Sequence, residues 1–202
     1  MATLVMIYGQ SGTGKSTSLR NFKAEDVAVV SVSGKPLPFR TDLKTFKTND
    51  YRRIKEALSK TDRKSIVIDD ATYLMADKVL SQADVAGYGK WTVLAKEFAD
   101  FLLFCQNLSD DKIVYVIGHT DIDNNGREHF KSYGKMLDDA LCTVEARFVI
   151  VLKSLALDGK YYFETHNNGS NTVKSPLGLF EEDRIENDLK AVDAAIREYW
   201  NI

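Results

Sequence analysis

A glycine-rich stretch near the N-terminus constrains this chain more than any other part of its sequence. The stretch reads Gly9-Gln10-Ser11-Gly12-Thr13-Gly14-Lys15-Ser16-Thr17, which matches the pattern G-x-x-x-x-G-K-[ST]. The apolar residues 3–8 before it predict a buried strand, and residues 16–22 after it predict the first turns of a helix. Glycines at such a turn let successive backbone N–H groups point inward, and the helix start adds partial positive charge. This combination predicts a binding site for the phosphate groups of a nucleotide.

Three side chains of this loop have distinct expected roles. By analogy with the motif, Lys15 reaches the β and γ phosphates of ATP, the Ser16 hydroxyl binds Mg²⁺ and Thr17 donates to the α phosphate. The alternative is a glycine-rich turn that carries a surface lysine. That alternative does not account for the strand and the helix that flank the loop, so the sequence favours the phosphate site.

A second stretch, Ser65-Ile66-Val67-Ile68-Asp69-Asp70, is mostly β-branched and apolar and ends in two carboxylates. A buried parallel strand of this kind delivers an acid to the edge of the sheet where nucleotides bind. We expect Asp69 to hold Mg²⁺ through water and Asp70 to polarise the attacking water. The alternative is a strand followed by an acidic helix cap.

Polar residues also follow the apolar strand predicted for residues 112–118. His119 and Thr120 come directly after this strand. A polar side chain at such a strand tip can sense the γ phosphate, so His119 joins Lys15, Asp69 and Asp70 as a candidate catalytic residue. The alternative is that His119 and Thr120 only cap the strand.

Length and composition bound the class of protein. A chain of 202 residues fits one domain over residues 1–202, and 44% hydrophobic with 28% charged residues is ordinary for a globular protein. No apolar run approaches the ~20 residues of a membrane span, and no signal peptide is recognisable, so we expect no membrane partner and a cytoplasmic location. Cys105 and Cys142 lie in apolar contexts, which favours buried thiols over a disulfide or a metal site.

The remaining elements alternate between strands and helices. The expected strands cover residues 27–33, 112–118, 146–153 and 160–165, the last two joined by a turn at Asp158-Gly159. The expected helices cover residues 51–60, 71–78, 91–108, 135–145 and 182–199, with Asp50 as the N-cap of the first. Residues 79–89 and 121–134 read as loops. The order predicts an α/β fold whose mostly parallel sheet is covered by helices on both faces.

Residues 35–64 form a cationic segment inside a chain of net charge −2. The segment holds ten Lys or Arg residues against four Asp or Glu residues, a net charge of +6. It could contact a polyanion such as nucleic acid. The alternative is an ordinary solvated face.

The order of elements resembles the RecA-like core of phosphate-loop nucleotide triphosphatases, and the chain is similar to the short RecA-like ATP-binding proteins of bacteriophages. Besides the glycine loop and the acid-bearing strand, the resemblance rests on Gly118-His119-Thr120, Gly134-Lys135-Met136-Leu137 and Asn168-Gly169-Ser170-Asn171-Thr172-Val173-Lys174-Ser175-Pro176. It implies a mostly parallel five-stranded sheet in the order 5-1-4-3-2, followed by an antiparallel hairpin and a helix.

The resemblance also implies a function. It implies ATP hydrolysis with Mg²⁺ and action on single-stranded DNA, since some proteins of this family act in recombination or strand annealing. It implies a homo-oligomer, a single-stranded-DNA-binding protein as a candidate partner, and the host cytoplasm as the location of a phage-encoded member. Residues 79–89 and 121–133 match the family's two DNA loops, whose candidate contacts here are Tyr88, Lys90, Arg127, Phe130, Lys131 and Tyr133.

Two departures from the family pattern leave other functions open. Ser33 stands where the family has a catalytic glutamate, so Asp70 substitutes for it or hydrolysis is slow. The late hairpin offers only Lys153 and Lys174 as cations for a neighbouring subunit's site. A nucleotide-dependent regulatory module with little hydrolysis is one alternative. A small-molecule kinase is another, although residues 121–133 hold only one arginine for a lid.

Overall fold

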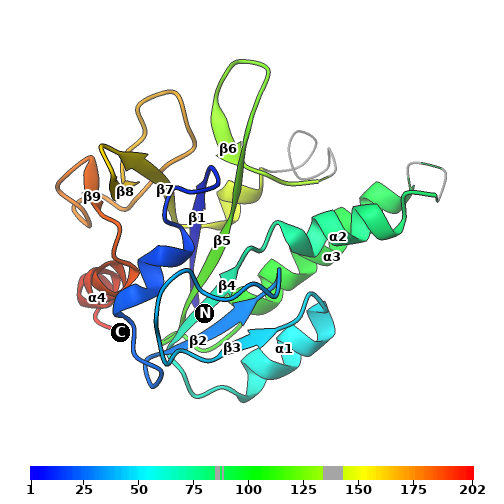
Figure 1. Cartoon of the computed structure of the whole chain (residues 1–202), viewed down its shortest axis with the longest axis horizontal. Helices are drawn as coiled ribbons and strands as arrows, with labels where there is room; N and C mark the ends of the chain where they lie inside the picture. The colour runs from blue at the N-terminus through cyan, green and yellow to red at the C-terminus, as the bar shows by residue number, and fades with distance from the viewer. Residues whose placement is uncertain (85–86, 88, 134–142) are drawn as a thin grey trace.

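The computed structural model describes residues 1–84, 87, 89–133 and 143–202 of the chain. Within these residues a nine-stranded sheet forms the centre, with helices on both faces (Figure 1). The strands are β1 (Thr3–Gly9), β2 (Val27–Ser31), β3 (Thr45–Lys47), β4 (Ser65–Asp69), β5 (Ile113–Ile122), β6 (Glu128–Phe130), β7 (Ile150–Leu157), β8 (Lys160–Glu164) and β9 (Arg184–Glu186).

Four α-helices are described. They are α1 (Tyr51–Lys60), α2 (Tyr73–Ser81), α3 (Gly89–Gln106) and α4 (Leu189–Trp200), and short 3₁₀ helices span Ser16–Asn21 and Val144–Arg147. Asp50 caps α1 as predicted, because its carboxylate accepts from the backbone N–H groups of Arg52 and Arg53. None of the described helices combines the length and apolar character needed to cross a bilayer.

The strands follow the order β3-β2-β4-β5-β1-β7-β8-β9, and β6 pairs with β5. From β3 to β7 neighbouring strands are parallel, and β8 and β9 continue the sheet antiparallel. The five strands expected to form the parallel core therefore lie in the predicted order. The predicted number of five is wrong, because β8 joins the same sheet and β3, β6 and β9 add three short strands. Each of those three has only three residues, too few to show an alternating pattern.

The segment after the β5 core differs most from the prediction. The sequence predicts a loop over residues 121–134, but β5 runs on to Ile122 and pairs antiparallel with β6. The turn between the two strands forms because the Asp123 carboxylate accepts from the N–H groups of Asn125 and Arg127, while Gly126 adopts a φ of +79°. Because the residues of this turn are polar, the sequence predicts a loop that also includes the strand residues on either side of the turn.

Several helix and strand boundaries also move. The last helix begins at Leu189 rather than residue 182, because Arg184–Glu186 pairs with β8 and the Asp188 carboxylate caps α4. Strand β7 begins at Ile150 rather than residue 146, after the 3₁₀ helix. Helix α2 extends to Ser81 and α3 begins at Gly89, so the predicted loop 79–89 is shorter. Most of the predicted helix 135–145 lies outside the described residues.

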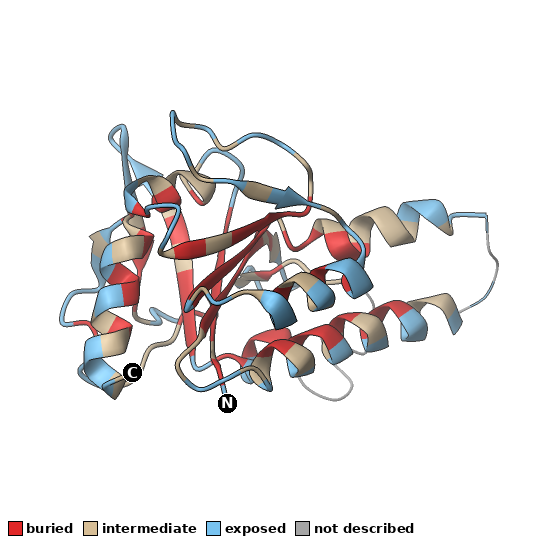
Figure 2. Cartoon of the chain, turned by 90° about the horizontal axis from the view of Figure 1, so that it is seen from below, coloured by how far each residue is buried: buried red, intermediate tan, exposed pale blue. Residues whose placement is uncertain are grey.

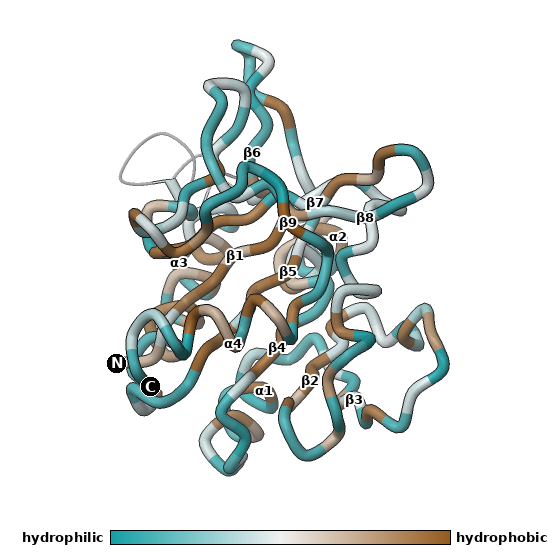
Figure 3. The backbone as a smooth tube through the Cα atoms, turned by 90° about the vertical axis from the view of Figure 1, so that its left-hand side faces the viewer, coloured by the Kyte–Doolittle hydropathy of each residue, from teal (hydrophilic) through white to brown (hydrophobic). Residues whose placement is uncertain are grey.

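Two hydrophobic cores lie on opposite faces of the sheet, because side chains alternate along each strand. Met6 and Tyr8 of β1 pack toward α1, α2 and α3, whereas Val5 and Ile7 pack toward α4. The predicted apolar stripe of α3 is buried, including Cys105, and burial raises the pKa of that thiol to about 12. The central strands are buried along their length (Figure 2), and they consist mostly of hydrophobic residues (Figure 3).

A buried polar network holds α4 against the sheet. One carboxylate oxygen of Asp193 accepts from the hydroxyls of Ser65 at 2.7 Å and Tyr115 at 2.9 Å. The other accepts from Arg197 Nε at 2.9 Å. Burial raises the pKa of Tyr115, and the neighbouring charge of Asp193 raises it further. The network lies at the amino ends of β4 and β5, opposite the edge where the glycine loop lies.

Candidate nucleotide-binding site

The glycine loop follows β1 at the carboxyl edge of the parallel strands. Lys15 is 7% exposed, and its Nζ donates to the carbonyl oxygens of Gly9 at 2.9 Å and Gln10 at 2.7 Å. Burial lowers the pKa of Lys15, while Asp70 and Asp69 act in the opposite direction. The predicted helix after the loop forms as the 3₁₀ helix Ser16–Asn21. The lysine is thus held inside the curve of the loop, where the motif places phosphate groups.

The β7–β8 hairpin supports the loop from its other side. The Ser154 hydroxyl donates to the Thr13 carbonyl at 2.6 Å. Gly14 has a φ of +86°, and a Cβ added there would lie 2.6 Å from the Tyr161 ring. Ser154 and Tyr161 were not predicted. Only the parallel pairing of β1 with β7 brings them to the loop, and no local spacing reveals that pairing.

Ser16 and Asp69 meet although 53 positions separate them in the chain. The Ser16 hydroxyl donates to Asp69 Oδ1 at 3.0 Å, and the same oxygen accepts from the backbone N–H of Asp70 at 3.1 Å. Burial, and then the charge of Asp70, raise the pKa of Asp69 to about 6. A hydroxyl beside a carboxylate is a donor set that suits Mg²⁺, which commonly takes its other ligands from phosphates and water.

The site offers few protein ligands for a metal, which is consistent with Mg²⁺ taking its other ligands from phosphates and water. Among the described residues, no group of three or more His, Cys, Asp or Glu side chains could hold a metal by itself. That Ser16 and Asp69 would hold Mg²⁺ together with a bound nucleotide stays a prediction, with which their hydrogen bond agrees.

Asp70 lies at the centre of a second cluster. Its Oδ2 accepts from the Ser33 hydroxyl at 2.6 Å and lies 3.9 Å from Lys35 Nζ, while its Oδ1 lies 3.6 Å from His119 Nε2. Its backbone is left-handed, with a φ of +60°. Ser33, at the position where the resemblance implies a glutamate, is thus hydrogen-bonded to Asp70, the candidate base.

His119 lies beside Asp70 on the neighbouring part of the sheet. Its backbone N–H donates to Thr72 Oγ1 at 3.0 Å, and its ring packs edge-on against Tyr73. Within the described part of the chain, its buried Nε2 makes no hydrogen bond. Burial lowers the pKa of His119, and the charge of Lys15 lowers it further. A neutral imidazole with an unused nitrogen can hydrogen-bond to a phosphate or to water.

Among the described residues, the predicted DNA contacts differ in burial and in their partners. Phe130 is 1% exposed and stacks on Phe98, so its predicted role in stacking on bases is wrong. Lys131 lies 3.4 Å from Asp121, and Arg127 Nε donates to the Asn171 carbonyl at 3.0 Å.

Two of the predicted contacts are neighbours, because Lys131 Nζ lies 6.0 Å from the centre of the Tyr133 ring. Lys90 is at the start of α3, where its Nζ donates to the Gln82 carbonyl, and Tyr133 is partly buried against the core. Tyr88 lies outside the described residues.

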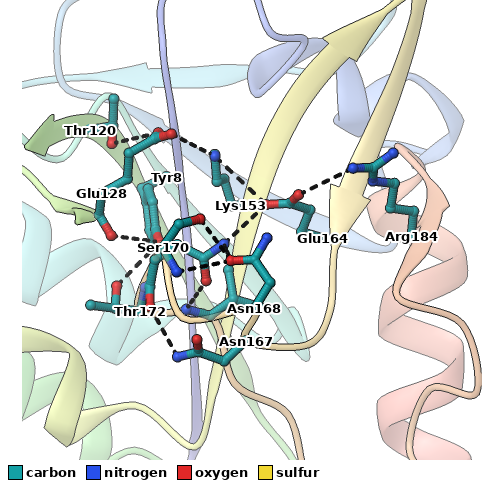
Figure 4. A network of polar contacts seen from close by, with 12 residues as sticks. Tyr8, Thr120, Glu128, Lys153, Glu164, Asn167, Asn168, Ser170, Thr172 and Arg184 are labelled. Atoms are coloured by element: carbon teal, nitrogen blue, oxygen red, sulfur yellow. Dashed lines mark hydrogen bonds and ion pairs between the residues drawn. The ribbon is translucent and has the colours of Figure 1, made fainter. Parts of the chain in front are cut away.

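Of the two cations proposed for a neighbouring subunit's site, Lys153 has ion-pair partners within this chain. Lys153 Nζ lies 2.7 Å from Glu128 and 3.6 Å from Glu164, inside the polar network that joins the two hairpins (Figure 4). The backbone of Lys174 pairs with Val151. The Lys153 ammonium is committed to internal ion pairs, so it does not serve as a free cation for another subunit.

The comparison with known families agrees with this geometry. A family model described as an AAA domain matches residues 1–140. The chain belongs to this AAA domain family. AAA domains bind ATP, usually with Mg²⁺, and they usually hydrolyse it, in agreement with the predicted phosphate-loop class. No curated protein matches the chain.

Proposed function

We propose that this chain is a Mg²⁺-dependent ATP hydrolase built as one RecA-like domain over residues 1–202. The observation that carries the proposal is the hydrogen bond of 3.0 Å between Ser16 of the glycine loop and Asp69 of β4. It joins the two motifs at the mouth of the loop that encloses Lys15. Asp70, which follows β4, and His119, in β5, lie next to each other at the same site. The candidate groups for phosphate binding and for hydrolysis therefore lie together.

Each of these residues has a separate role in the proposed hydrolysis. Lys15 and the backbone N–H groups of the loop bind the phosphates, and Ser16 and Asp69 hold the metal ion that neutralises charge on them. Asp70 accepts a proton from water as the water oxygen bonds to the γ phosphorus and the bond to ADP breaks. Ser33 keeps the Asp70 carboxylate oriented, and His119 Nε2 hydrogen-bonds to the γ phosphate.

Nucleotide titration of Lys15→Ala tests the proposal. Loss of the lysine should weaken ATP binding on the order of 2–4 kcal/mol, because a charge-assisted contact to phosphate is removed. Lys44→Gln, which removes an exposed cation from the segment after β2, should bind like the wild type. Unchanged ATP affinity and turnover in folded Lys15→Ala would overturn the assignment.

We further propose that the ATPase acts on single-stranded DNA in recombination or strand annealing, as a homo-oligomer. Four exposed cations support this proposal, since Lys44, Lys47, Arg52 and Arg53 lie at or next to β3 and at the start of α1. Arg53 lies over the Phe46 ring at 5.5 Å, and Phe46 is 38% exposed. This basic β3–α1 surface comprises Lys44, Phe46, Lys47, Arg52 and Arg53.

Cations beside an exposed aromatic ring suit a single strand, because backbone charge and unpaired bases are bound together. Fluorescence anisotropy with a labelled oligonucleotide, across a salt series and alongside phosphate release, tests the proposal. Lys47→Glu with Arg52→Glu should weaken binding and flatten its salt dependence. Lys160→Glu, a charge reversal on the far side of the sheet, is the control.

The same experiment separates the alternative functions. Absence of binding at low salt with ATP present, with turnover unchanged by DNA, would rule out the DNA proposal. A regulatory module would then bind ATP with little turnover, and a kinase would transfer phosphate to an added small molecule.

A further inference from the structure

Lys35 lies at the phosphate site although it belongs to neither motif. It follows β2 and Gly34, whose φ of +71° turns the chain back toward the carboxyl edge of the sheet. Its carbonyl accepts from the Ser31 hydroxyl at 3.1 Å. Since Ser31 pairs with Asp69 in the sheet, this hydrogen bond fixes the backbone of Lys35 beside the acid-bearing strand.

The Lys35 side chain reaches across Tyr73 to Asp70. Its Nζ lies 5.2 Å from the centre of the Tyr73 ring and 3.9 Å from Asp70 Oδ2. The Asp70 side chain is 14% exposed, whereas that of Lys35 is 65% exposed. The ammonium is therefore loosely held at the rim of the site, with a flexible stem and rotatable donors.

Two other groups experience the charge of Lys35. It contributes to lowering the pKa of Lys15 and of His119, after larger contributions from burial in both cases. The ammonium thus lies within electrostatic range of the lysine and the histidine that flank the γ-phosphate position. Lys153, one of the two candidates for a cation in a neighbouring subunit's site, is instead paired with Glu128 and Glu164.

We propose that Lys35 is a catalytic residue of this ATPase, whose ammonium leaves Asp70 and binds a γ-phosphate oxygen when ATP binds. The inference rests on the proposed ATP hydrolysis. Lys35 would thus supply, from within the same chain, the positive charge that the family resemblance expects from a neighbouring subunit. Its departure also leaves Asp70 free to take the water proton, while Lys35 itself stays protonated as the new bond to phosphorus forms and the bond to ADP breaks.

Equilibrium binding tests the inference without turnover. Lys35→Gln should bind the non-hydrolysable analogue AMP-PNP about tenfold to a hundredfold more weakly than the wild type, because a charged hydrogen bond to the γ phosphate is lost. Its ADP affinity should stay within about twofold, since ADP has no γ phosphate. Lys35→Arg should retain most of the AMP-PNP affinity, and Lys23→Gln, which removes another exposed cation, should match the wild type for both nucleotides.

A second readout uses the nucleotide-free protein. In NMR titrations of the histidine ring protons, His119 should titrate at higher pH in Lys35→Gln than in the wild type, because a nearby positive charge has been removed. An unchanged His119 titration would overturn the placement of the ammonium at the site. Equal losses of AMP-PNP and ADP affinity, or unchanged affinity for both, would overturn the role at the γ phosphate.

The wild-type measurements keep this inference separate from the proposed function. If the wild type binds AMP-PNP in a Lys15-dependent manner and Lys35→Gln binds equally well, only the role of Lys35 fails. If the wild type binds neither nucleotide, the proposed function fails and this inference fails with it.

Discussion

Asp69 and Asp70 are adjacent in the chain but meet different surroundings. Asp69 is 6% exposed and accepts hydrogen bonds from Ser16 and from a backbone N–H. Asp70 faces a hydroxyl, an ammonium and an imidazole at the rim of the site. The first environment suits a ligand for a metal ion, and the second suits a group that exchanges a proton with water.

The buried charge of Asp69 has a cost in the absence of nucleotide. Its pKa is raised from 3.8 to about 6 in the folded protein, so the folded state binds more protons than the unfolded state between these values. The free energy of unfolding therefore falls as the pH rises through this window, and the ionised carboxylate is destabilising at pH 7.

We expect Asp69→Asn to stabilise the nucleotide-free protein at pH 7 by on the order of 1–3 kcal/mol, because the amide oxygen still accepts both hydrogen bonds without a charge. The gain should shrink toward pH 4, and the variant should lose Mg²⁺-dependent nucleotide binding. Urea denaturation at both pH values measures the effect, with exposed Asp84→Asn as the control. A variant less stable than the wild type at pH 7 would contradict this account.

Asp70→Asn should separate binding from chemistry. The amide keeps the size of the side chain but cannot take a proton, so ATP should bind normally while hydrolysis slows by about 10²-fold or more. Single-turnover phosphate release, compared with equilibrium ATP binding, measures both quantities. Normal hydrolysis in this variant would mean that another group activates the water.

Some residues of the candidate site could be predicted from the local sequence, and others could not. The glycine loop and the two carboxylates each lie in a contiguous motif next to an apolar strand, so local sequence was sufficient. Lys35 reaches the site through a glycine turn, and Tyr161 through the pairing of β1 with β7. Both depend on contacts distant in sequence, which a local pattern does not encode.

Among the elements, β5 links the nucleotide site to an exposed hairpin. The strand carries Gly118 and His119 and then runs without interruption to Ile122, where it extends with β6 beyond the sheet (Figure 1). Gly118 lets the hairpin pack closely. A Cβ added there would lie 2.6 Å from Thr72 Oγ1 and nearer still to the ring of Phe130.

Gly118→Ala should therefore displace both neighbours. We expect a loss of about 1–3 kcal/mol in the free energy of unfolding from overpacking, together with weaker ATP binding because Thr72 holds His119. Gly89→Ala is a matched control, since a Cβ there meets no atom within 4 Å. Thermal denaturation and nucleotide titration of both variants would reveal whether the close packing at Gly118 matters.

The elements that sequence predicted well carry strong local signals. Helix α1 has a capping aspartate and an apolar stripe, and its predicted ends match the structure. Strands β3 and β9 are fixed instead by their partners β2 and β8. Since backbone pairing rather than side-chain pattern forms them, they could not be recognised in isolation.

At the scale of the whole molecule, the family match covers less of the chain than the fold does. The match covers residues 1–140, yet β7 pairs directly with β1 and α4 covers one face of the sheet. The last third of the chain therefore completes the core and supports the glycine loop through Ser154.

Asp193→Ala should test how strongly α4 stabilises the whole fold. The change leaves Tyr115, Ser65 and Arg197 without their shared acceptor, which should cost about 3–5 kcal/mol. Nucleotide affinity of the folded fraction should be unchanged, because the network lies at the opposite edge of the sheet. Urea denaturation and ADP titration measure the two quantities, with exposed Asp183→Ala as the control. An altered ADP affinity would show that the two edges are coupled.

The left-handed backbone of Asp70 limits how this position can evolve. Glycine, asparagine and aspartate adopt such a conformation readily, whereas longer and branched side chains are disfavoured. Glutamate, the obvious chemical substitute, is therefore a poor replacement on backbone grounds. On the proposed mechanism, the changes that this backbone accepts, to asparagine or glycine, would remove the base. On the same mechanism, one substitution would turn the proposed ATPase into a protein that binds ATP with little hydrolysis, whereas a longer carboxylate as the base would require a different backbone conformation at this position.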